Sequence, residues 1–374
     1  MRVLLDVSAV PARPVGAGVY TTAIARGLSA HADVELHLAT RKGDDARWQA
    51  IAPDARAHAV VPDRRPARIV WEQTQAIRLL HSVAPDVWHG PHYTMPMRGA
   101  EPAVVTVHDL TFFDHPEWHE RSKVIFFRRM IAAAARRATV LVCVSEFTAS
   151  RLRALCSPVG QIVVVPHGVD HDRFAPVAAA SDEVRLASHG VRSPYVAFQG
   201  TLEPRKDVPT LVRAFARVAR ARSDLQLVLA GGDGWGADAV RAEITRSGVA
   251  TRILRPGYLD HTTVAALLRH ADVVAYPSLE EGFGLPALEA LASGTPLVTT
   301  RGSAVEEVVG DAALLVEPGD VEGLACALAA VLDNQATATR LRSAGPPRAA
   351  AFTWKRSVDG HVDAYRRAVA KARE

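Results

Sequence analysis

The sequence has 374 residues, of which 48% are hydrophobic, and a formal net charge of +4. A chain of this length can bury the cores of two domains, and its mild basicity falls well short of a nucleic-acid-binding tail. No apolar run is as long as a membrane span, and Asp6 interrupts the apolar start MRVLLDVSAV, which we predict to be a strand and not a signal peptide. The three cysteines lack metal-ligand spacing, so we expect reduced thiols in the cytoplasm.

Strands and helices alternate along the chain. Predicted strands cover 2–10, 34–39, 58–61, 86–89, 103–107, 140–144, 162–165, 195–200, 225–232, 252–257, 271–277, 296–300 and 313–316. Predicted helices cover 16–28, 67–83, 120–137, 208–219, 237–247 and 262–269, with further helices after residue 320 and a candidate capping box at Ser303 and Glu306. The segment 165–194 loses this periodicity and is expected to connect two domains. The pattern is typical of α/β proteins and predicts two doubly wound, Rossmann-like domains that face each other across a cleft.

The stretch YPSLEEGFGLPALEALASGT, residues 276–295, is predicted to end a strand, form a glycine loop and begin a helix. Gly282 and Gly284 carry no side chain, so a ligand can approach the backbone N–H groups of the loop. Glu281 and Glu289 flank it. A helix N-terminus favours anions, so carboxylates beside it suit ligand hydroxyls, as in a sugar and a ribose joined by a diphosphate. A solvated acidic loop with one capping acid explains the spacing equally well.

Two strand ends of the first half carry further candidate residues, because ligands of doubly wound sheets bind beyond the carboxyl ends of the strands. The first strand leads to Gly16 and Gly18, which form either a phosphate-cradling turn or a plain tight turn. The strand 103–107 leads to His108 and Asp109.

The strand 195–200 leads to Gly200 and then to Arg205 and Lys206. Two adjacent cations before a helix suit a diphosphate, since arginine binds it with two hydrogen bonds and lysine acts as a point charge. Cations oppose the dipole at the start of a helix, which favours this role over a solvated first turn. No metal site is predicted, because no D-x-D motif follows an apolar strand and the histidine pairs lack a third ligand.

The motifs, taken in order, resemble glycosyltransferase family 4, whose members are retaining enzymes with the GT-B fold. They are G-A-G-V-Y (16–20), VTVHDLTF (105–112), VSEFTASRL (144–152), VVPHGVD (164–170), GTLEPRKDVPTLVRAF (200–215), LAGGDG (229–234), EEGFGLPALEALASGTPLV (280–298) and SAVEEVVGDAALLVEPGD (303–320). Glu281 and Glu289 match the spacing of the family's two acids. HDLTFF and GTLEPRK resemble bacterial mannosyltransferases in particular.

The resemblance implies a role for each candidate residue. Arg205 and Lys206 would bind the donor diphosphate and stabilise the leaving nucleotide. Glu289 would hold the ribose hydroxyls, Glu281 the hydroxyls of the transferred sugar, and His108 would contact that sugar at the reacting centre. The catalytic set would be His108, Arg205, Lys206 and Glu281. The donor-binding set would be Gly16, Gly18, Gly200, Arg205, Lys206, Gly257, Tyr258, Glu281, Gly282, Phe283, Gly284, Leu285 and Glu289.

The implied activity is metal-independent, retaining transfer of a hexosyl group from a nucleotide-diphosphate sugar to a glycan, glycolipid or small-molecule acceptor. GDP-mannose is the first candidate donor, and no cofactor is expected. Retention would follow from front-face attack, or from a covalent intermediate for which Asp109 is the only candidate carboxylate. Residues 1–180 would form the acceptor side, 181–353 would bind the nucleotide-sugar, and 354–374 would return to the N-terminal domain. The alternatives are another GT-B enzyme, such as an epimerase or phosphorylase, and a non-catalytic nucleotide-sugar-binding protein.

The predicted helix 120–137 carries Arg121, Arg128, Arg129 and Arg136 within about one third of its circumference. This basic face is either solvated or docks on anionic lipid, where the enzyme would meet a lipid-linked acceptor. The expected location is therefore the cytoplasm, with peripheral contact to the inner face of the membrane as an option, and no nucleic-acid partner is expected.

Overall fold

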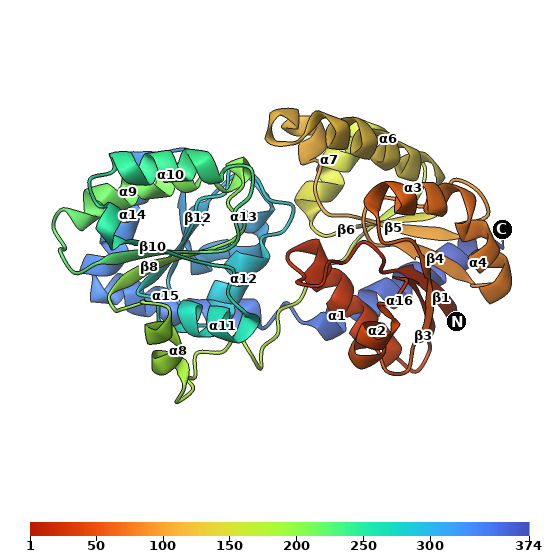
Figure 1. Cartoon of the computed structure of the whole chain (residues 1–374), viewed down its shortest axis with the longest axis horizontal. Coiled ribbons are helices and arrows are strands. Elements are labelled where there is room, and N and C mark those ends of the chain that lie inside the picture. Colours follow the sequence, from red (N-terminus) through yellow and green to blue (C-terminus); the bar gives the residue numbers. More distant parts are fainter. Residues whose placement is uncertain (374) are drawn as a thin grey trace. The chain divides into compact units, whose positions relative to one another are not determined.

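The structure is a computed structural model that describes residues 1–373 and divides them into two units (Figure 1). The N-terminal unit comprises Met1–Gly168 and the helix that begins at Trp354, and the C-terminal unit comprises Val169–Thr353. The chain thus passes between the units at Gly168, before the expected boundary at residue 180. Each unit contains one parallel sheet with helices on both faces, which confirms the α/β class with two Rossmann-like domains.

The sheet of the N-terminal unit has seven strands in the order β3-β2-β1-β4-β5-β6-β7. The strands are β1 (Arg2–Asp6), β2 (Glu35–Arg41), β3 (Arg56–Val61), β4 (Val87–Gly90), β5 (Ala103–Val107), β6 (Val140–Cys143) and β7 (Gln161–Val164). The chain runs outward from β1 to β3 and returns to β4 beside β1, so the direction of winding reverses between β1 and β4. This reversal is the topological switch point, where ligands bind in doubly wound sheets.

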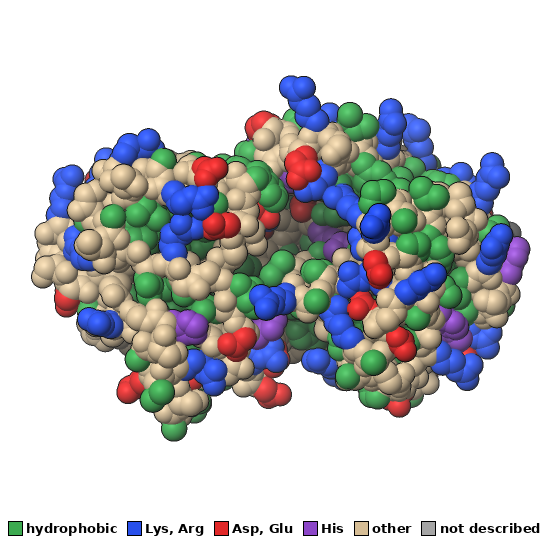
Figure 2. Space-filling model, in the orientation of Figure 1, with side chains coloured by type: hydrophobic (Ala, Val, Ile, Leu, Met, Phe, Trp, Pro, Cys, Tyr) green, Lys and Arg blue, Asp and Glu red, His purple; other side chains and the backbone are tan. Residues whose placement is uncertain are grey.

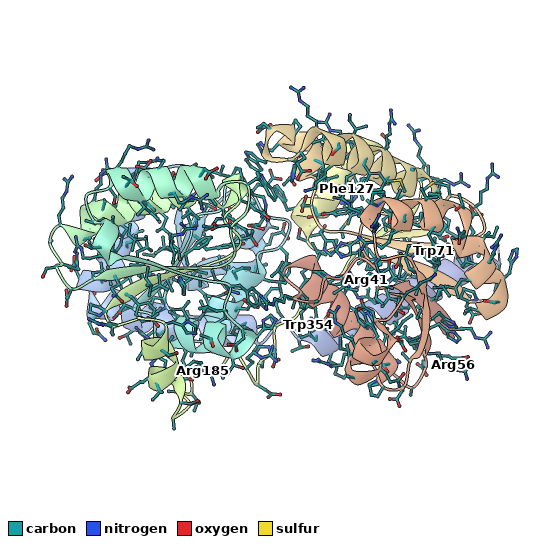
Figure 3. All side chains as sticks on the ribbon, in the orientation of Figure 1. Arg41, Arg56, Trp71, Phe127, Arg185 and Trp354 are labelled. Carbon is teal, nitrogen blue, oxygen red and sulfur yellow. The ribbon has the colours of Figure 1, made fainter. Side chains whose placement is uncertain are left out.

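Helices cover both faces of this sheet (Figure 1). On one face lie α3 (Arg65–Thr74), α4 (Ala76–Val83), α6 (Arg121–Arg137) and α7 (Glu146–Cys156), and on the other α1 (Ala17–Ser29), α2 (Asp45–Ile51) and α16 (Trp354–Lys371). The short α5 (Thr111–Asp114) precedes α6. Trp71 of α3 belongs to the first core layer, on the side of α3, α4, α6 and α7, and Phe127 of α6 packs against that layer; both are labelled in Figure 3. Tyr20, Trp48 and Tyr365 belong to the second, so α16 completes the core of the N-terminal unit.

The C-terminal sheet has six strands in the order β10-β9-β8-β11-β12-β13, and its switch point lies between β8 and β11. The strands are β8 (Tyr195–Gln199), β9 (Gln226–Ala230), β10 (Ile253–Gly257), β11 (Val273–Tyr276), β12 (Leu297–Thr300) and β13 (Leu314–Val316). Its helices are α8 (Asp182–Ser188), α9 (Val208–Ala219), α10 (Ala237–Arg246), α11 (His261–His270), α12 (Leu285–Ala292), α13 (Ala304–Val309), α14 (Val321–Asp333) and α15 (Gln335–Ala349). Figure 1 shows α9, α10 and α14 on one face and α11, α12 and α15 on the other.

Three local predictions were wrong. The first strand ends at Asp6 and not at residue 10, because Asp6 Oδ1 accepts the Ser8 N–H (2.9 Å) and turns the chain. The helix predicted over 67–83 is two helices, since Gln75 has φ −113°, away from helical values near −63°. The capping box at the start of α13 does not form: the Ser303 side chain makes no capping hydrogen bond, and Glu306 accepts from the Gly302 N–H (2.9 Å).

Candidate donor-binding site

The switch point of the C-terminal sheet brings the segment after β8 beside the segment after β11. The first segment forms a short 3-10 helix that carries Arg205 and Lys206, and the second carries Glu281. Lys206 Nζ lies 2.5 Å from Glu281 Oε1, and an Arg205 guanidinium nitrogen pairs with Glu281 Oε2. The backbone joins the two segments as well, because the Leu279 N–H donates to the Arg205 carbonyl (2.8 Å). The structure therefore brings three of the four predicted catalytic residues into one cluster.

Tyr276 completes this cluster at the end of β11. Its hydroxyl donates to Glu281 Oε1 (2.7 Å) and also contacts Lys206 Nζ, which lies 4.6 Å from the centroid of the tyrosine ring. Tyr276 is 1% exposed. Sequence reasoning used this residue only to mark the end of a strand and missed its place in the site. A residue with a polar tip, directly before the glycine loop, was the available signal.

Burial and charge together set the ionisation of the cluster. Burial, with the neighbouring Arg205 cation, lowers the pKa of Lys206 from 10.5 to about 8, although Glu281 opposes the change. Burial alone would raise the pKa of Glu281, but Arg205 and Lys206 lower it to about 2. Burial and the Glu281 charge raise the pKa of Tyr276 well above its usual value. At neutral pH Arg205 and Lys206 thus share the Glu281 carboxylate, and Arg205 also pairs with Glu203 Oε2 (3.4 Å).

Glu289 lies in a different environment on α12. It is 7% exposed, and its Oε2 accepts from Gln199 Nε2 (2.9 Å) at the end of β8. No cation forms an ion pair with it in the described part of the chain, and burial raises its pKa from 4.5 to about 7. Gln199 was also missed from the sequence, and its Oε1 is buried without a hydrogen-bond partner among residues 1–373. This pair offers a ligand two polar groups that the protein itself leaves largely unsatisfied.

The glycine loop has the backbone geometry that the sequence suggested. Gly284 has φ +99°, and a Cβ there would lie 2.7 Å from Val305 Cγ2, so no other residue fits. Gly284 also precedes α12, whose first turn begins at Leu285 and receives no side-chain capping hydrogen bond. Gly282 and Phe283 are buried in the same loop. The uncapped first turn of α12 is a favourable site for an anion.

Of the remaining predicted donor residues of this unit, Gly200 adjoins the cluster, since a Cβ built on it would lie 3.7 Å from Lys206 Cε, whereas Gly257 and Tyr258 lie farther along the sheet. Gly200, at φ +150°, follows β8, and its N–H donates to the Ala230 carbonyl (2.9 Å). Gly257 and Tyr258 lie at the end of the edge strand β10, which β9 separates from β8. No hydrogen bond or ion pair described here joins Gly257 to the Glu281 cluster, so its place in the donor site stays a prediction.

Gly16, Gly18 and His108 belong to the N-terminal unit. Gly16 has φ +49° and precedes α1, and a Cβ on Gly18 would lie 3.2 Å from Pro14. His108 follows β5 with its Nε2 2.8 Å from the Pro91 carbonyl, and burial lowers its pKa, so the ring is neutral at pH 7. The adjacent carboxylate, that of Asp109, accepts from the Thr111 backbone and hydroxyl and from Tyr93, which is a turn-forming role.

A buried network that the sequence did not suggest fixes α16 beneath His108. The Tyr20 hydroxyl lies 2.8 Å from Thr106 Oγ1 and 2.7 Å from His361 Nε2. The Tyr365 hydroxyl lies 2.7 Å from His89 Nδ1. The Tyr20 ring meets the His108 ring edge-on, with 5.0 Å between centroids. Helix α16 is therefore hydrogen-bonded to α1 through Tyr20 and to β4 through His89.

The described residues contain neither a candidate metal site nor a helix that could span a membrane. No group of three or more His, Cys, Asp or Glu side chains within residues 1–373 could hold a metal ion. No helix in that range is both long and apolar enough to cross a membrane.

Comparison with known proteins identifies the family. The model of "Glycosyltransferase Family 4" matches residues 14–173, and that of "Glycosyl transferases group 1" matches residues 186–348. O-antigen chain mannosyltransferase B of Escherichia coli is 30% identical over 75% of this chain and 74% of its own length. MMP alpha-(1->4)-mannosyltransferase of Mycolicibacterium hassiacum is 35% identical over 66% of this chain and 58% of its own.

Solved structures agree on the fold. Sucrose-phosphate synthase from Thermosynechococcus elongatus superimposes with a TM-score of 0.80 over 99% of both chains, at 22% identity. Anabaena Alr3699/HepE, solved in complex with UDP-glucose, superimposes with a TM-score of 0.78 over 97% of this chain and 98% of that one, at 18% identity. At these identities the likeness concerns the fold alone. Together with the family matches, it means that the chain belongs to glycosyltransferase family 4 and is a hexosyltransferase with the GT-B fold.

Proposed function

We propose that the protein transfers a hexosyl group, with mannosyl as the first candidate, from a nucleotide-diphosphate sugar to a glycan, glycolipid or small-molecule acceptor. Transfer retains the anomeric configuration and needs no metal ion. The observation that carries the proposal is the Arg205–Lys206–Glu281 cluster at the C-terminal switch point, beside the uncapped start of α12. A diphosphate fits this site because two cations lie together beside the uncapped start of α12, where it would replace Glu203 and Glu281 as their counter-charge.

The donor contacts follow from this charge balance. The diphosphate pairs with Arg205 and Lys206, which then stabilise the charge that grows on the leaving nucleotide, in the role that a metal ion fills in other transferases. Glu281 meanwhile accepts hydrogen bonds from the transferred sugar, and Glu289 with Gln199 accepts them from the ribose. His108 contacts the sugar as a neutral ring: its Nε2–H donates to the Pro91 carbonyl, so Nδ1 can accept one hydrogen bond from a sugar hydroxyl.

Retention by front-face attack suits this chain better than a covalent glycosyl-enzyme. Asp109 is the candidate nucleophile, yet both of its carboxylate oxygens accept hydrogen bonds from Thr111 and Tyr93. A carboxylate held in this way is a weak nucleophile. In front-face attack the leaving phosphate takes the proton of the acceptor hydroxyl instead. Proton NMR of the first-formed product tests the stereochemistry, and inversion at the anomeric carbon would refute this part of the proposal.

Donor identity is tested by thermal stabilisation with GDP, UDP, dTDP and ADP. GDP is expected to give the largest shift, because two relatives are named as mannosyltransferases. Saturating ligand raises stability by about 3 kcal/mol at a hundred times its dissociation constant, so the preferred base stands out. A larger shift with UDP would move the proposal to a UDP-sugar, for which the UDP-glucose complex of Anabaena Alr3699/HepE is a precedent. No shift with any diphosphate would refute nucleotide-sugar binding.

The acceptor is proposed to be membrane-linked, with the protein on the inner face of the cell membrane. Arg121, Arg129 and Arg136 are exposed on α6, and Ile125 between them is 55% exposed. Arg128, the fourth arginine of the predicted face, instead donates to the carbonyls of α5 (2.6 and 3.1 Å). Three cations near an anionic surface contribute about 1 kcal/mol each, and Ile125 adds an apolar contact.

Flotation with liposomes at two salt concentrations tests this contact. We expect recovery with anionic lipid at low salt and its loss in a variant in which Arg121, Arg129 and Arg136 are changed to glutamine. The matched control changes three exposed arginines of the C-terminal unit, Arg217, Arg220 and Arg246. Equal recovery with neutral lipid, or equal loss in both variants, would contradict docking through α6 and favour a water-soluble acceptor.

A further inference from the structure

A continuous chain of hydrogen bonds runs through the core of the N-terminal unit. It links five side chains from four elements: Tyr20 of α1, His89 of β4, Thr106 of β5, and His361 and Tyr365 of α16. Each of the five is 0% exposed, so none of them contributes to the surface drawn in Figure 2. A buried polar network is favourable only when all its members are paired, so the partners of each group can be worked out one after another.

A single carbonyl group fixes the direction of every hydrogen bond in the chain. His361 Nδ1 lies 2.7 Å from the Ser357 carbonyl, which can only accept, so Nδ1 carries the ring proton. Burial lowers the pKa of His361 from 6.5 to about 4, so the ring is neutral at pH 7 and its Nε2 is an acceptor. The Tyr20 hydroxyl, 2.7 Å from this Nε2, must therefore donate to it.

The same reasoning orders the rest of the chain. Because the Tyr20 hydroxyl gives its one proton to His361, its oxygen accepts from the Thr106 hydroxyl (2.8 Å). The Thr106 oxygen then accepts from His89 Nε2 (2.9 Å), and His89 Nδ1 accepts from the Tyr365 hydroxyl (2.7 Å). Each hydroxyl proton and each ring nitrogen is used once. Removal of the Tyr20 hydroxyl would therefore leave a buried acceptor unpaired on one side and a buried donor on the other.

The ring of Tyr20, whose hydroxyl this chain holds, packs against the ring of His108. It meets His108 edge-on, with 5.0 Å between centroids and an angle of 79° between the ring planes. Three more rings lie farther from His108, at 5.4, 5.5 and 5.7 Å between centroids: His92, Tyr93 and His167. The hydrogen bond from His108 Nε2 to the Pro91 carbonyl holds one end of the imidazole, and a ring packed edge-on limits rotation about that end.

Tyr20 also belongs to the turn that carries the predicted donor glycines. It lies in the first turn of α1, and its N–H donates to the Gly16 carbonyl (3.2 Å). Thr106, its hydroxyl partner, lies in β5 two residues before His108. The Tyr20 side chain thus joins the helix that follows Gly16 to the strand that precedes His108, and its bond to His361 ties both to α16.

We propose that Tyr20 is a positioning residue for the transfer reaction: its hydroxyl, held between Thr106 and His361, keeps its ring where it orients His108 toward the transferred sugar. This role rests on the proposed function, because it acts through the contact of His108 with the sugar. The hydrogen-bond chain itself does not depend on that function. A small displacement at a reacting centre is costly, since about 1 Å can lower the rate about a hundredfold.

Nitrogen NMR of the full chain, isotope-labelled at the histidine nitrogens, tests the chain without any substitution. A neutral imidazole has one protonated and one unprotonated nitrogen, and their signals differ, so the tautomer of each ring can be determined. We expect the Nδ1–H tautomer for His361 and the Nε2–H tautomer for His89 and His108. Signals that disappear in His361→Asn or His108→Ala assign these rings. The Nε2–H tautomer at His361 would refute the chain, and the proposal with it.

A double-mutant cycle tests the positioning role. Tyr20→Phe keeps the ring and removes the hydroxyl, so kcat should fall about tenfold to a hundredfold, while nucleoside-diphosphate affinity stays at the wild-type value. In a His108→Ala background the same substitution should change kcat little further, because the residue through which Tyr20 acts is gone. The matched control is Tyr195→Phe, which removes a buried hydroxyl that donates to the Leu267 carbonyl (2.8 Å) in the C-terminal unit. It should leave kcat and the His108 signals unchanged.

The outcomes separate this inference from the proposed function. Equal relative losses of kcat in the two backgrounds, or His108 signals that Tyr20→Phe does not shift, would refute positioning and leave Tyr20 as a core residue. Shifted His108 signals in a protein that neither binds nucleotide nor transfers sugar would show that Tyr20 orients His108 and would refute the proposed function. Circular dichroism identifies a variant that does not fold. In that case Thr106→Val, which removes the donor to Tyr20, replaces Tyr20→Phe, and the wild-type tautomers decide if neither variant folds.

Discussion

The Glu289→Gln variant should make the protein more stable and its donor binding weaker. Glu289 is 7% exposed, and its pKa is raised from 4.5 to about 7 by burial. The unfolded chain therefore loses this proton at a lower pH than the folded protein does. The stability contributed by the protonated form is complete below pH 4.5 and is lost as the pH rises through about 7. Glutamine carries no charge at any pH, so the Glu289→Gln variant should not lose folding stability as the pH rises through 7.

The magnitude follows from the two pKa values. A pKa of about 7 in place of 4.5 corresponds to about 3 kcal/mol, which is an upper limit for the gain of the variant at pH 8. The amide still accepts from Gln199, so packing is kept. The ribose hydroxyls, however, lose an ionised acceptor, which weakens nucleoside-diphosphate binding roughly tenfold to hundredfold. Wild-type affinity should also fall as the pH drops below 7, and the affinity of the variant should not.

Urea unfolding at pH 4.5 and pH 8, combined with calorimetric titration of the diphosphate, measures both effects. The control is Glu183→Gln, which changes an exposed acid of the same unit and should alter neither quantity. A variant that is less stable than wild type at pH 8 would refute the burial argument. Unchanged nucleotide affinity would refute the assignment of Glu289 to the ribose.

Three further predictions follow from the ionised groups. Arg205→Ala should lower kcat more than it weakens donor affinity, because its charge acts on the leaving phosphate, and a change confined to the donor KM would make it a simple binding group. Glu281→Gln removes the carboxylate that the buried Lys206 shares with Arg205 and should cost about 3–5 kcal/mol in urea unfolding without ligand, so wild-type stability would contradict the described ion pairs. Burial lowers the pKa of His361 from 6.5 to about 4, so the unfolded chain takes up this proton first and stability should fall as the pH drops below 6.5. His361→Asn should flatten this decline in thermal unfolding, and an unchanged slope would refute it.

The fold and the centre of the donor site could be predicted from the sequence because parallel strands have a recognisable pattern. Parallel strands are apolar on both faces, and their carboxyl ends meet at one edge, so residues after strands converge in space. This rule predicts that Arg205, Lys206 and Glu281 lie close together, and the structure confirms their proximity. The family resemblance, now confirmed, added roles for these residues that spacing alone left open.

The other residues of the sites could not be predicted, because their positions depend on side-chain packing between segments that are far apart in the sequence. Tyr276 and Gln199 sit at strand ends like their neighbours, and only the register of β8 beside β11 turns them toward Glu281 and Glu289. His361 lies 341 residues after Tyr20 in the sequence, and only the packing of α16 in the core of the N-terminal unit brings the two side chains together. The ion pairing of Glu281 with both cations also required the folded loop.

The most direct test of the central claim is the release of nucleoside diphosphate from GDP-mannose, UDP-glucose and dTDP-glucose, measured with an acceptor panel and an excess of chelator. The account predicts release from one donor, undiminished by the chelator, dependent on an acceptor and strongly reduced in Arg205→Ala. No release from any donor, or release that Arg205→Ala leaves unchanged, would contradict a metal-independent transferase that acts through the C-terminal switch point.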